Sequence, residues 1–166
     1  SILNHYTYTK RKAEEICKKN NSIILRTNFF GKSHNKKDSF SDWVYKKFKS
    51  GNNFHLFDDV FFSPIRIVFL CKMIYKIILT GRQYSGIYNL GSQKGLSKKN
   101  FAIIFAKSLN IYNSNYTTVK SSKIFKIKRP NNMIMNCKKF EKKFQISLPT
   151  LKNQILDEVK INYNIK

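Results

Sequence analysis

A tyrosine and a lysine one helical turn apart, Tyr6 and Lys10, are residues whose types and spacing could do acid–base chemistry. Residues i and i+4 lie on one face of a helix. An ammonium group beside a phenol favours the phenolate form, so such a tyrosine can give or take a proton at neutral pH. Three further Tyr-x-x-x-Lys matches occur in this lysine-rich chain, so spacing alone does not single out the first. They are Tyr8/Lys12, Tyr45/Lys49 and Tyr116/Lys120.

Other side chains that catalyse reactions or bind metals are scattered. Cys17, Cys71 and Cys137 are far apart and form no CxxC pair, which favours neither a disulfide framework nor a zinc site and fits a reducing, cytoplasmic setting. His34 and His55 have no companions at metal-ligand spacing. The neighbouring residues Asp58 and Asp59 are interpreted as a turn rather than a catalytic dyad.

The composition predicts a folded protein without a membrane span. The chain has 166 residues, of which 42% are hydrophobic and 14% aromatic, enough to build a packed core. The most apolar stretch, residues 65–79, contains Arg66, Lys72 and Lys76, so no uncharged run is long enough to cross a bilayer.

The charge balance is strongly basic, with 32 Lys and Arg against 9 Asp and Glu, a net charge of +23. Taken alone, this charge indicates a nucleic acid or another anionic surface as a partner. Almost all the basic residues are lysines, however, and Lys, Asn and Ile share A/T-rich codons. Because guanidinium groups are the preferred readers of phosphates and bases, a nucleic-acid-binding role is disfavoured.

Helix-like and strand-like segments alternate along the chain, which indicates an α/β fold. A helix is predicted over residues 5–19, followed by a buried strand over 22–27 in which Arg26 needs a buried partner. Trp43 is predicted to lie in the core, since it shares a helical face with apolar neighbours. Further helices are predicted at 40–48, 65–79, 97–109, 137–144 and 150–163, and further strands at 54–57, 61–63, 87–90 and 116–120.

The surroundings of Tyr6 resemble a known family. Residues 4–10, with Ala13-Glu14, resemble the Y-G-x-T/S-K-x-x-x-E helix of extended short-chain dehydrogenases/reductases, although Thr7 replaces the usual glycine. Residues 24–28 resemble the L-R-T strand that follows it. Further similar segments occur in the same order: Phe30-Gly31, Phe62–Ile65 (F-S-P-I), Gly86–Ser92 (G-I-Y-N-L-G-S), Leu96-Ser97 and Arg129–Asn132 with Lys138 or Lys139. Together these segments are most similar to the dTDP-4-dehydrorhamnose reductase branch of the family.

The resemblance implies an α/β fold that is the C-terminal portion of such an enzyme. Residues 1–31 would contribute the catalytic helix and the closing strand of an incomplete dinucleotide-binding domain. Residues 32–166 would form mainly the sugar-nucleotide-binding domain. No glycine-rich turn for a dinucleotide pyrophosphate is found. The chain alone is therefore expected neither to bind NADPH tightly nor to turn over, and an unpaired sheet edge is expected to make it poorly soluble.

The activity that the resemblance implies is reduction of a nucleotide-linked 4-keto sugar with NADP(H) or NAD(H). Tyr6 would protonate the developing alkoxide, Lys10 would hydrogen-bond the nicotinamide ribose, and Asn28 would lie at the nicotinamide end of the cofactor. Arg129 would contact the diphosphate, because its guanidinium can bind phosphate oxygens in a bidentate way, but a structural role is weighted equally.

Two alternatives stay open. One is a sugar-nucleotide epimerase or dehydratase, which shares the tyrosine and lysine but needs further acid or base groups. The other is a non-catalytic basic module, whose binding to nucleic acid would weaken steeply with salt.

Overall fold

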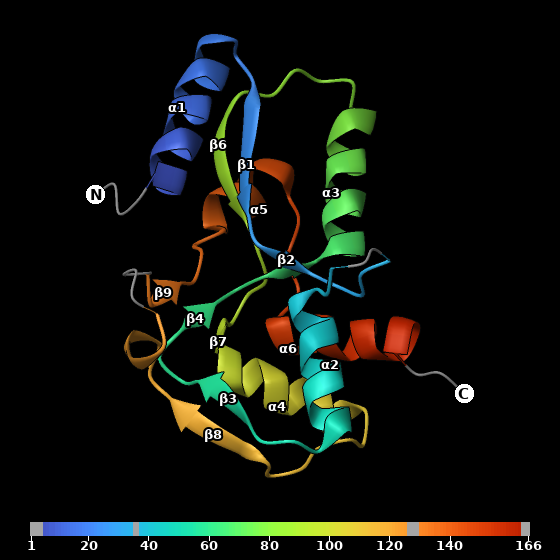
Figure 1. Cartoon of the computed structure of the whole chain (residues 1–166). Coiled ribbons are helices and arrows are strands. Elements are labelled where there is room, and N and C mark those ends of the chain that lie inside the picture. The colour runs from blue at the N-terminus through green and yellow to red at the C-terminus, as the bar shows by residue number, and fades with distance from the viewer. Residues whose placement is uncertain (1–4, 35–36, 126–129, 164–166) are drawn as a thin grey trace.

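The computed structural model describes residues 5–34, 37–125 and 130–163. Figure 1 shows an upper part, in which parallel strands lie between helices, and a lower part in which helices pack with short sheets. The helices are α1 (His5–Lys19), α2 (Phe40–Ser50), α3 (Ile67–Leu79), α4 (Lys98–Ser108), α5 (Lys138–Phe144) and α6 (Leu151–Glu158), with helical turns η1 (Ser121–Lys123) and η2 (Val159–Tyr163). No helix in the described part of the chain combines the length and apolar character needed to cross a membrane.

The strands pair in four small groups. Their bounds are β1 (Ile23–Thr27), β2 (Phe29–Phe30), β3 (Phe54–Phe57), β4 (Phe61–Phe62), β5 (Ile65–Arg66), β6 (Gly86–Leu90), β7 (Leu96–Ser97), β8 (Tyr116–Val119) and β9 (Asn132–Met133). The pairs β1–β6, β2–β5 and β3–β8 are parallel, and β4 lies between β7 and β9 in a three-stranded sheet. The predicted α/β class is therefore confirmed.

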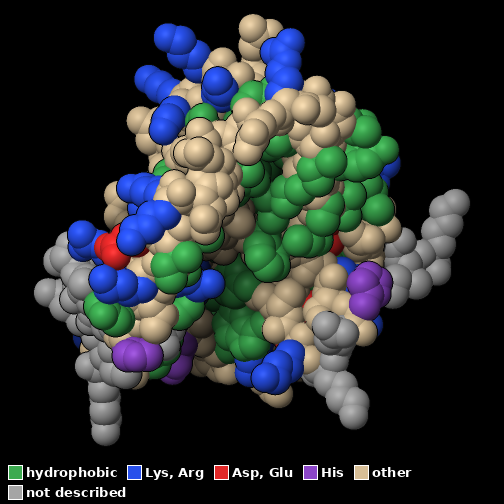
Figure 2. Space-filling view, turned by 90° about the horizontal axis from the view of Figure 1, so that it is seen from above, with side chains coloured by type: hydrophobic (Ala, Val, Ile, Leu, Met, Phe, Trp, Pro, Cys, Tyr) green, Lys and Arg blue, Asp and Glu red, His purple; other side chains and the backbone are tan. Residues whose placement is uncertain are grey.

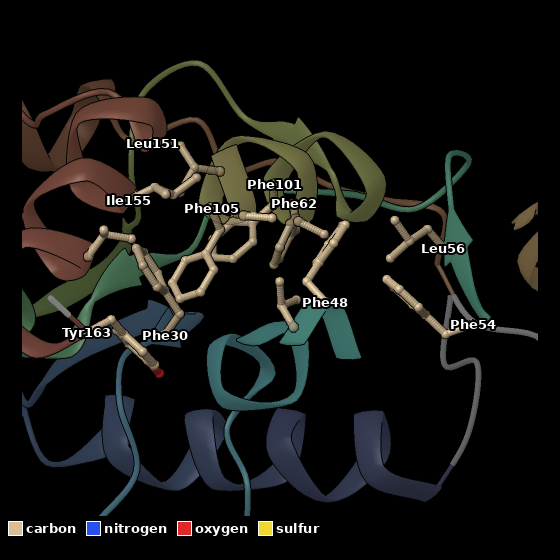
Figure 3. Packing of buried hydrophobic residues seen from close by; sticks show 14 residues of the cluster. Phe30, Phe48, Phe54, Leu56, Phe62, Phe101, Phe105, Leu151, Ile155 and Tyr163 are labelled. Carbon is tan, nitrogen blue, oxygen red and sulfur yellow. The ribbon is translucent and has the colours of Figure 1, made fainter. Parts of the chain in front are cut away.

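Two apolar cores hold these elements. The upper core packs α3 and α5 against one face of the β1–β6 pair, through residues such as Leu70, Tyr88 and Phe140. The lower core is rich in aromatic rings and joins α2, α4 and α6, as Figure 3 shows for Phe48 and Phe101. Helix α1 lies on the other side of the pair (Figure 1). None of its residues is buried, so few apolar contacts hold it there.

Several helix boundaries follow from local capping. The Ser39 hydroxyl accepts a hydrogen bond from the backbone N–H of Asp42 at 3.1 Å, and the Asp42 carboxylate accepts one from the N–H of Ser39, which forms a capping box at the start of α2. Gly51 ends this helix with a φ of 68°. Ser97 caps α4 as the sequence predicts, because its hydroxyl accepts from the N–H of Asn100.

Three details of the predicted elements are wrong. The strand β1 is only half-buried at residues 23–25 and exposed at 26–27, because one of its edges has no partner strand among the described residues. Residues 65–66 are not helical; they pair with β2, and α3 begins at Ile67. The helix predicted over 150–163 is α-helical only from Leu151 to Glu158, and Val159–Tyr163 form the π-helical turn η2.

A buried ion pair joins α6 to β5. The Nε of Arg66 lies 3.5 Å from Oε2 of Glu158, and the two residues are 8% and 0% exposed. The other oxygen of Glu158 accepts a hydrogen bond from the backbone N–H of Lys32 at 2.8 Å, and Gln154 accepts one from the N–H of Arg66 at 2.9 Å. These contacts fix the C-terminal helix against the segment that connects the upper and lower parts.

Candidate active site

An open cavity of about 650 Å³ lies between α1 and the carboxyl ends of β1 and β6. Tyr6 and Asn28 both line it, although they are on different elements. Its other lining residues are Arg26, Thr27, Phe29, Asn89, Met133, Ile134, Met135 and Asn136. Because carboxyl ends of parallel strands meet at one edge of a sheet, this edge is the usual position for a ligand in an open α/β fold.

Tyr6 and Lys10 lie on the same face of α1. The Nζ atom of Lys10 is 5.7 Å from the centre of the Tyr6 ring, within the range of a cation–π contact. Tyr6 is 69% exposed, so its phenol is accessible to a ligand. Lys10 lines an adjoining cavity of about 510 Å³, to which Arg26 also belongs. Arg26 therefore lies between the two cavities.

The position of α1 depends on an ion pair between Arg26 and Glu14. Nε of Arg26 donates to one carboxylate oxygen of Glu14 at 2.6 Å, and Nη2 donates to the other at 2.5 Å. Arg26 thus has a partner as predicted, but the predicted burial is wrong, since the side chains of Arg26 and Glu14 are 53% and 20% exposed. The hydrogen bond from Arg26 lowers the pKa of Glu14, although partial burial opposes this. The pair is thus a bidentate link from β1 to the helix that carries Tyr6 and Lys10.

Replacing Arg26 by leucine is expected to destabilise the protein by about 1 kcal/mol. The loss is smaller than for a buried ion pair, because water screens the partly exposed charges. The folded-state pKa of Glu14 is lowered, so its contribution to stability is present above the pKa of the unfolded chain and is lost as the pH falls through the lowered folded-state value. Urea unfolding at pH 7 and at pH 3 measures this: the difference between wild type and Arg26→Leu should shrink at pH 3. Equal stability of the two proteins at pH 7 would contradict the anchoring role.

The walls of the cavity include residues that the sequence did not single out. Phe29 is exposed directly after Asn28, and Asn89 donates from its side-chain amide to the carbonyl of Asn136 at 3.1 Å. Met133 comes from β9, which is far away in the sequence. Phe29 could have been found from the sequence, since it lies only two residues after the predicted strand 22–27. No such signal was available for Met133, because its position depends on the pairing of two-residue strands.

A second cavity, of about 680 Å³, is lined by aromatic and basic side chains in the lower part. Phe40 and Trp43 on α2 are stacked with ring centres 5.9 Å apart, and Lys47 follows on the same helix. Lys98 places its Nζ 5.2 Å from the centre of the Phe40 ring. The remaining lining residues are residues 53–57. The prediction that Trp43 lies in the core is only partly right, because it is half-buried and borders this cavity.

The strand β4 lies between elements that border the two cavities. Its residue Phe61 pairs with Ser97 on one side and with Asn132 on the other. Lys98, which lines the second cavity (the aromatic cavity), follows Ser97 in the chain. Met133, which lines the cavity that contains Tyr6 (the Tyr6 cavity), follows Asn132. Since neighbouring strands are about 4.8 Å apart, Ser97 and Asn132 are separated by about 10 Å.

Arg129, the predicted diphosphate contact, lies outside the described residues. In the described ranges, no group of three or more His, Cys, Asp or Glu side chains could hold a metal ion.

The fold and the site define an α/β protein with a ligand cavity at the carboxyl ends of parallel strands. The RmlD substrate binding domain profile matches residues 2–163, so the chain belongs to this family. Comparison with curated proteins finds no significant match. The predicted resemblance to the dTDP-4-dehydrorhamnose reductases, and through them to extended short-chain dehydrogenases/reductases, is confirmed.

Solved structures share this fold. The dTDP-4-dehydrorhamnose reductase from Bacillus anthracis in complex with NADP superposes with a TM-score of 0.83 at 21% identity, over 96% of this chain and 56% of that one. The reductase from Clostridium acetobutylicum gives 0.82 at 17%, with the same coverage. The dTDP-glucose 4,6-dehydratase from Bacillus anthracis in complex with NAD gives 0.74 at 15%, over 95% and 51%. The chain thus spans about half the length of the solved proteins it matches.

Proposed function

We propose that this chain supplies the catalytic helix and the sugar-nucleotide-binding domain of an NADPH- or NADH-dependent reductase that acts on a nucleotide-linked 4-keto sugar. The observation that carries the proposal is the common cavity of Tyr6 and Asn28, with the Lys10 ammonium beside the Tyr6 ring, in a chain of the RmlD substrate binding domain family. In this proposal residues 1–31 complete a dinucleotide-binding domain, and residues 32–166 mainly bind the sugar nucleotide.

Tyr6 is the proposed general acid. When bound, a reduced nicotinamide supplies a hydride to the keto carbon of the sugar. The Tyr6 phenol donates its proton to the carbonyl oxygen, so that the ketone becomes an alcohol and no free alkoxide is formed. The Lys10 ammonium stabilises the phenolate that remains and has donors for a ribose hydroxyl.

The residues of this chain fit only one end of such a cofactor. Tyr6, Lys10 and Asn28 border the open cavities beside β1, where a nicotinamide and its ribose can be held. The six glycines of the sequence do not form the G-x-x-G-x-x-G turn that binds the pyrophosphate. Tight binding of the dinucleotide therefore requires a further glycine-rich segment.

The aromatic cavity is the proposed site for the nucleotide end of the substrate. Phe40 and Trp43 offer ring faces for a base, and stacking of a base on an aromatic side chain contributes about 1–3 kcal/mol. Lys47 and Lys98 supply positive charge for a diphosphate. An extended ligand that crosses β4 would reach from this cavity to the Tyr6 cavity.

Binding of dTDP can be measured through Trp43, because it is the only tryptophan of the chain. We expect dTDP to quench its fluorescence in a saturable way. The Lys47→Ala variant is expected to bind about tenfold more weakly, since a charge-assisted hydrogen bond contributes about 1.5 kcal/mol.

Lys152→Ala is the matched control, because it removes the same charge from an exposed position on α6 outside the cavity lining. Absence of quenching, or equal weakening by both substitutions, would argue against a nucleotide in this cavity.

An epimerase or dehydratase is the second candidate, because a dTDP-glucose 4,6-dehydratase shares the fold. That chemistry needs acid or base groups besides the tyrosine and lysine. Among the described residues that line the Tyr6 cavity, none is Asp, Glu, His or Cys. This composition favours the reductase, and analysis of the product formed by the full enzyme distinguishes the two reactions.

A further inference from the structure

Another cavity, of about 390 Å³, lies at the opposite end of β6 from the Tyr6 cavity; we call it the basic cavity. The Tyr6 cavity borders the carboxyl end of β6 through Asn89, whereas Tyr84 of the basic cavity precedes Gly86, the first residue of this strand. Because β6 has five residues, its two ends are about 15 Å apart. The lining residues of the basic cavity come from α3, from the loop that follows it and from the end of α5. The basic cavity is therefore separate from the proposed catalytic groups.

The way in which α3 ends brings Arg82 to this cavity. Gly81 follows the helix with a φ of 62°, a left-handed conformation that glycine adopts without strain. The Thr80 hydroxyl accepts a hydrogen bond from the backbone N–H of Arg82 at 3.3 Å and donates to the carbonyl of Ile77 at 2.7 Å. These bonds turn the chain and hold Arg82 at the end of the helix whose last turn carries Lys76.

The cavity has an excess of positive charge. Among the described residues, its lining contains the cations Lys76, Arg82 and Lys143 and no carboxylate. Lys76 and Lys143 lie in the last turns of α3 and α5, where a cation offsets the negative end of a helix dipole. Each helix end carries only about half a negative charge, so the three full positive charges are not cancelled. Glu141, the acidic residue of α5, instead accepts from the side chain of Gln93 at 2.7 Å. Figure 2, which looks down on this end of the upper part, shows more Lys and Arg than Asp and Glu side chains.

Arg82 differs from the other arginines that the structure describes. Each of those lies within 3.6 Å of a carboxylate, in the pairs Arg11–Glu15, Arg26–Glu14 and Arg66–Glu158. No carboxylate of the described residues pairs with Arg82, which is exposed and lines the basic cavity. A lysine-rich composition does not account for an arginine here. Because a guanidinium group can bind two phosphate oxygens at once, Arg82 is suited to a phosphate ligand.

An apolar wall lies beside these charges. The rings of Tyr84 and Phe144 meet edge to face with their centres 5.0 Å apart, and both side chains pack against the upper core. Nζ of Lys143 lies 5.6 Å from the centre of the Tyr84 ring, so positive charge and aromatic surface are adjacent. Ile77, which is 8% exposed, adds to the apolar lining. A fitting ligand therefore carries an anionic group next to an apolar part.

We infer that the basic cavity binds a small organic phosphate. Its phosphate group contacts Arg82, Lys76 and Lys143, and its apolar part lies against Tyr84 and Phe144. The cavity is concave and has the size of a small-molecule site, whereas a polyanion is bound along an extended basic groove. The basic cavity shares no lining residue with the Tyr6 cavity or the aromatic cavity, so the inference stands whether or not the chain is part of a reductase.

Phenyl phosphate is the probe for this site, because it joins a phosphate group to a single ring. We expect it to raise the Tm of the 166-residue chain in a saturable way, since a ligand that binds only the folded state stabilises it. Thermal unfolding followed by the fluorescence of Trp43 measures this. Inorganic phosphate lacks the ring and should need about tenfold higher concentration for the same rise. The Arg82→Ala variant should need at least about tenfold more phenyl phosphate, since it loses a charge-assisted contact.

Two pairs of lysines provide matched controls. Lys143→Ala and Lys142→Ala remove the same charge from neighbouring positions on α5, but only Lys143 lines the cavity. Lys76→Ala and Lys72→Ala form the equivalent pair on α3, where only Lys76 lines it. The first member of each pair should raise the required concentration at least about fivefold, and the second less than about twofold. All four side chains are exposed, so these substitutions leave the core intact.

Four results would overturn the inference. They are no rise in Tm with phenyl phosphate, equal effects of phenyl phosphate and inorganic phosphate, and equal effects of the two substitutions within each lysine pair. The fourth is loss of the response in Lys47→Ala but not in Arg82→Ala, which would place the probe in the aromatic cavity instead.

Discussion

Replacing Tyr6 by phenylalanine is expected to lower kcat about 100- to 10,000-fold in a full reductase that contains this chain, since this is the usual contribution of a general acid. The substitution removes only the hydroxyl that donates the proton and keeps the ring beside Lys10. KM for the sugar nucleotide should change little, because the proton is transferred in the transition state rather than in the bound ground state. Steady-state kinetics with the 4-keto sugar nucleotide measure both constants.

Tyr8→Phe is a closely matched control. Tyr8 is on the same helix and has the same spacing to its lysine, and Nζ of Lys12 lies 5.9 Å from its ring centre. Tyr8 does not belong to the lining of the cavity, so its substitution should leave kcat within about twofold. If both variants lost activity to the same degree, or if Tyr6→Phe kept wild-type kcat, Tyr6 would not be the acid.

Replacing Glu158 by leucine is expected to reduce the free energy of unfolding by about 3–5 kcal/mol, since it leaves a buried arginine without its carboxylate. Arg66 is 8% exposed and its Nε has no hydrogen-bond partner besides the 3.5 Å contact with Glu158. The substitution also removes the acceptor for the N–H of Lys32. Urea unfolding followed by circular dichroism gives the change directly.

A second substitution separates the buried charge from other effects. The double variant Arg66→Met with Glu158→Leu should recover most of the lost stability, because an apolar pair of similar size has no charge to bury. Glu15→Gln, which affects only the exposed ion pairs of α1, should cost less than about 1 kcal/mol. A loss below that value for Glu158→Leu would show that Arg66 does not need its carboxylate partner, and no recovery in the double variant would show that the loss does not come from the unpaired buried charge.

Much of the local structure could be predicted from the sequence. The helix that carries Tyr6 and Lys10, the capped start of α4 and the strands β3 and β6 depend on spacing, capping residues and turns within about ten residues. Such signals are local, so the prediction that two side chains four residues apart share a face needed only the geometry of one helix.

The two-residue strands β2, β5, β7 and β9 escaped prediction because they are too short to show alternation, whereas β4 was predicted at 61–63. Residues 65–66 illustrate this. Their sequence continues the apolar pattern of the following helix, but in the structure they pair with β2 instead. The burial of strand 22–27 was overestimated for a similar reason. An apolar composition indicates that the side chains of a segment favour burial, but it does not tell whether a partner strand lies beside the segment.

The sequence by itself determined the family, the α/β order of the elements and the common helical face of Tyr6 and Lys10. Only the tertiary structure decided that Met133 borders the cavity of Tyr6, that Arg26 holds α1 from an exposed position, and that Trp43 borders a cavity rather than filling the core. The physical reason is that a helix is stabilised by contacts between near neighbours in the chain. A cavity is formed by residues far apart in sequence, and their meeting depends on how all the elements pack.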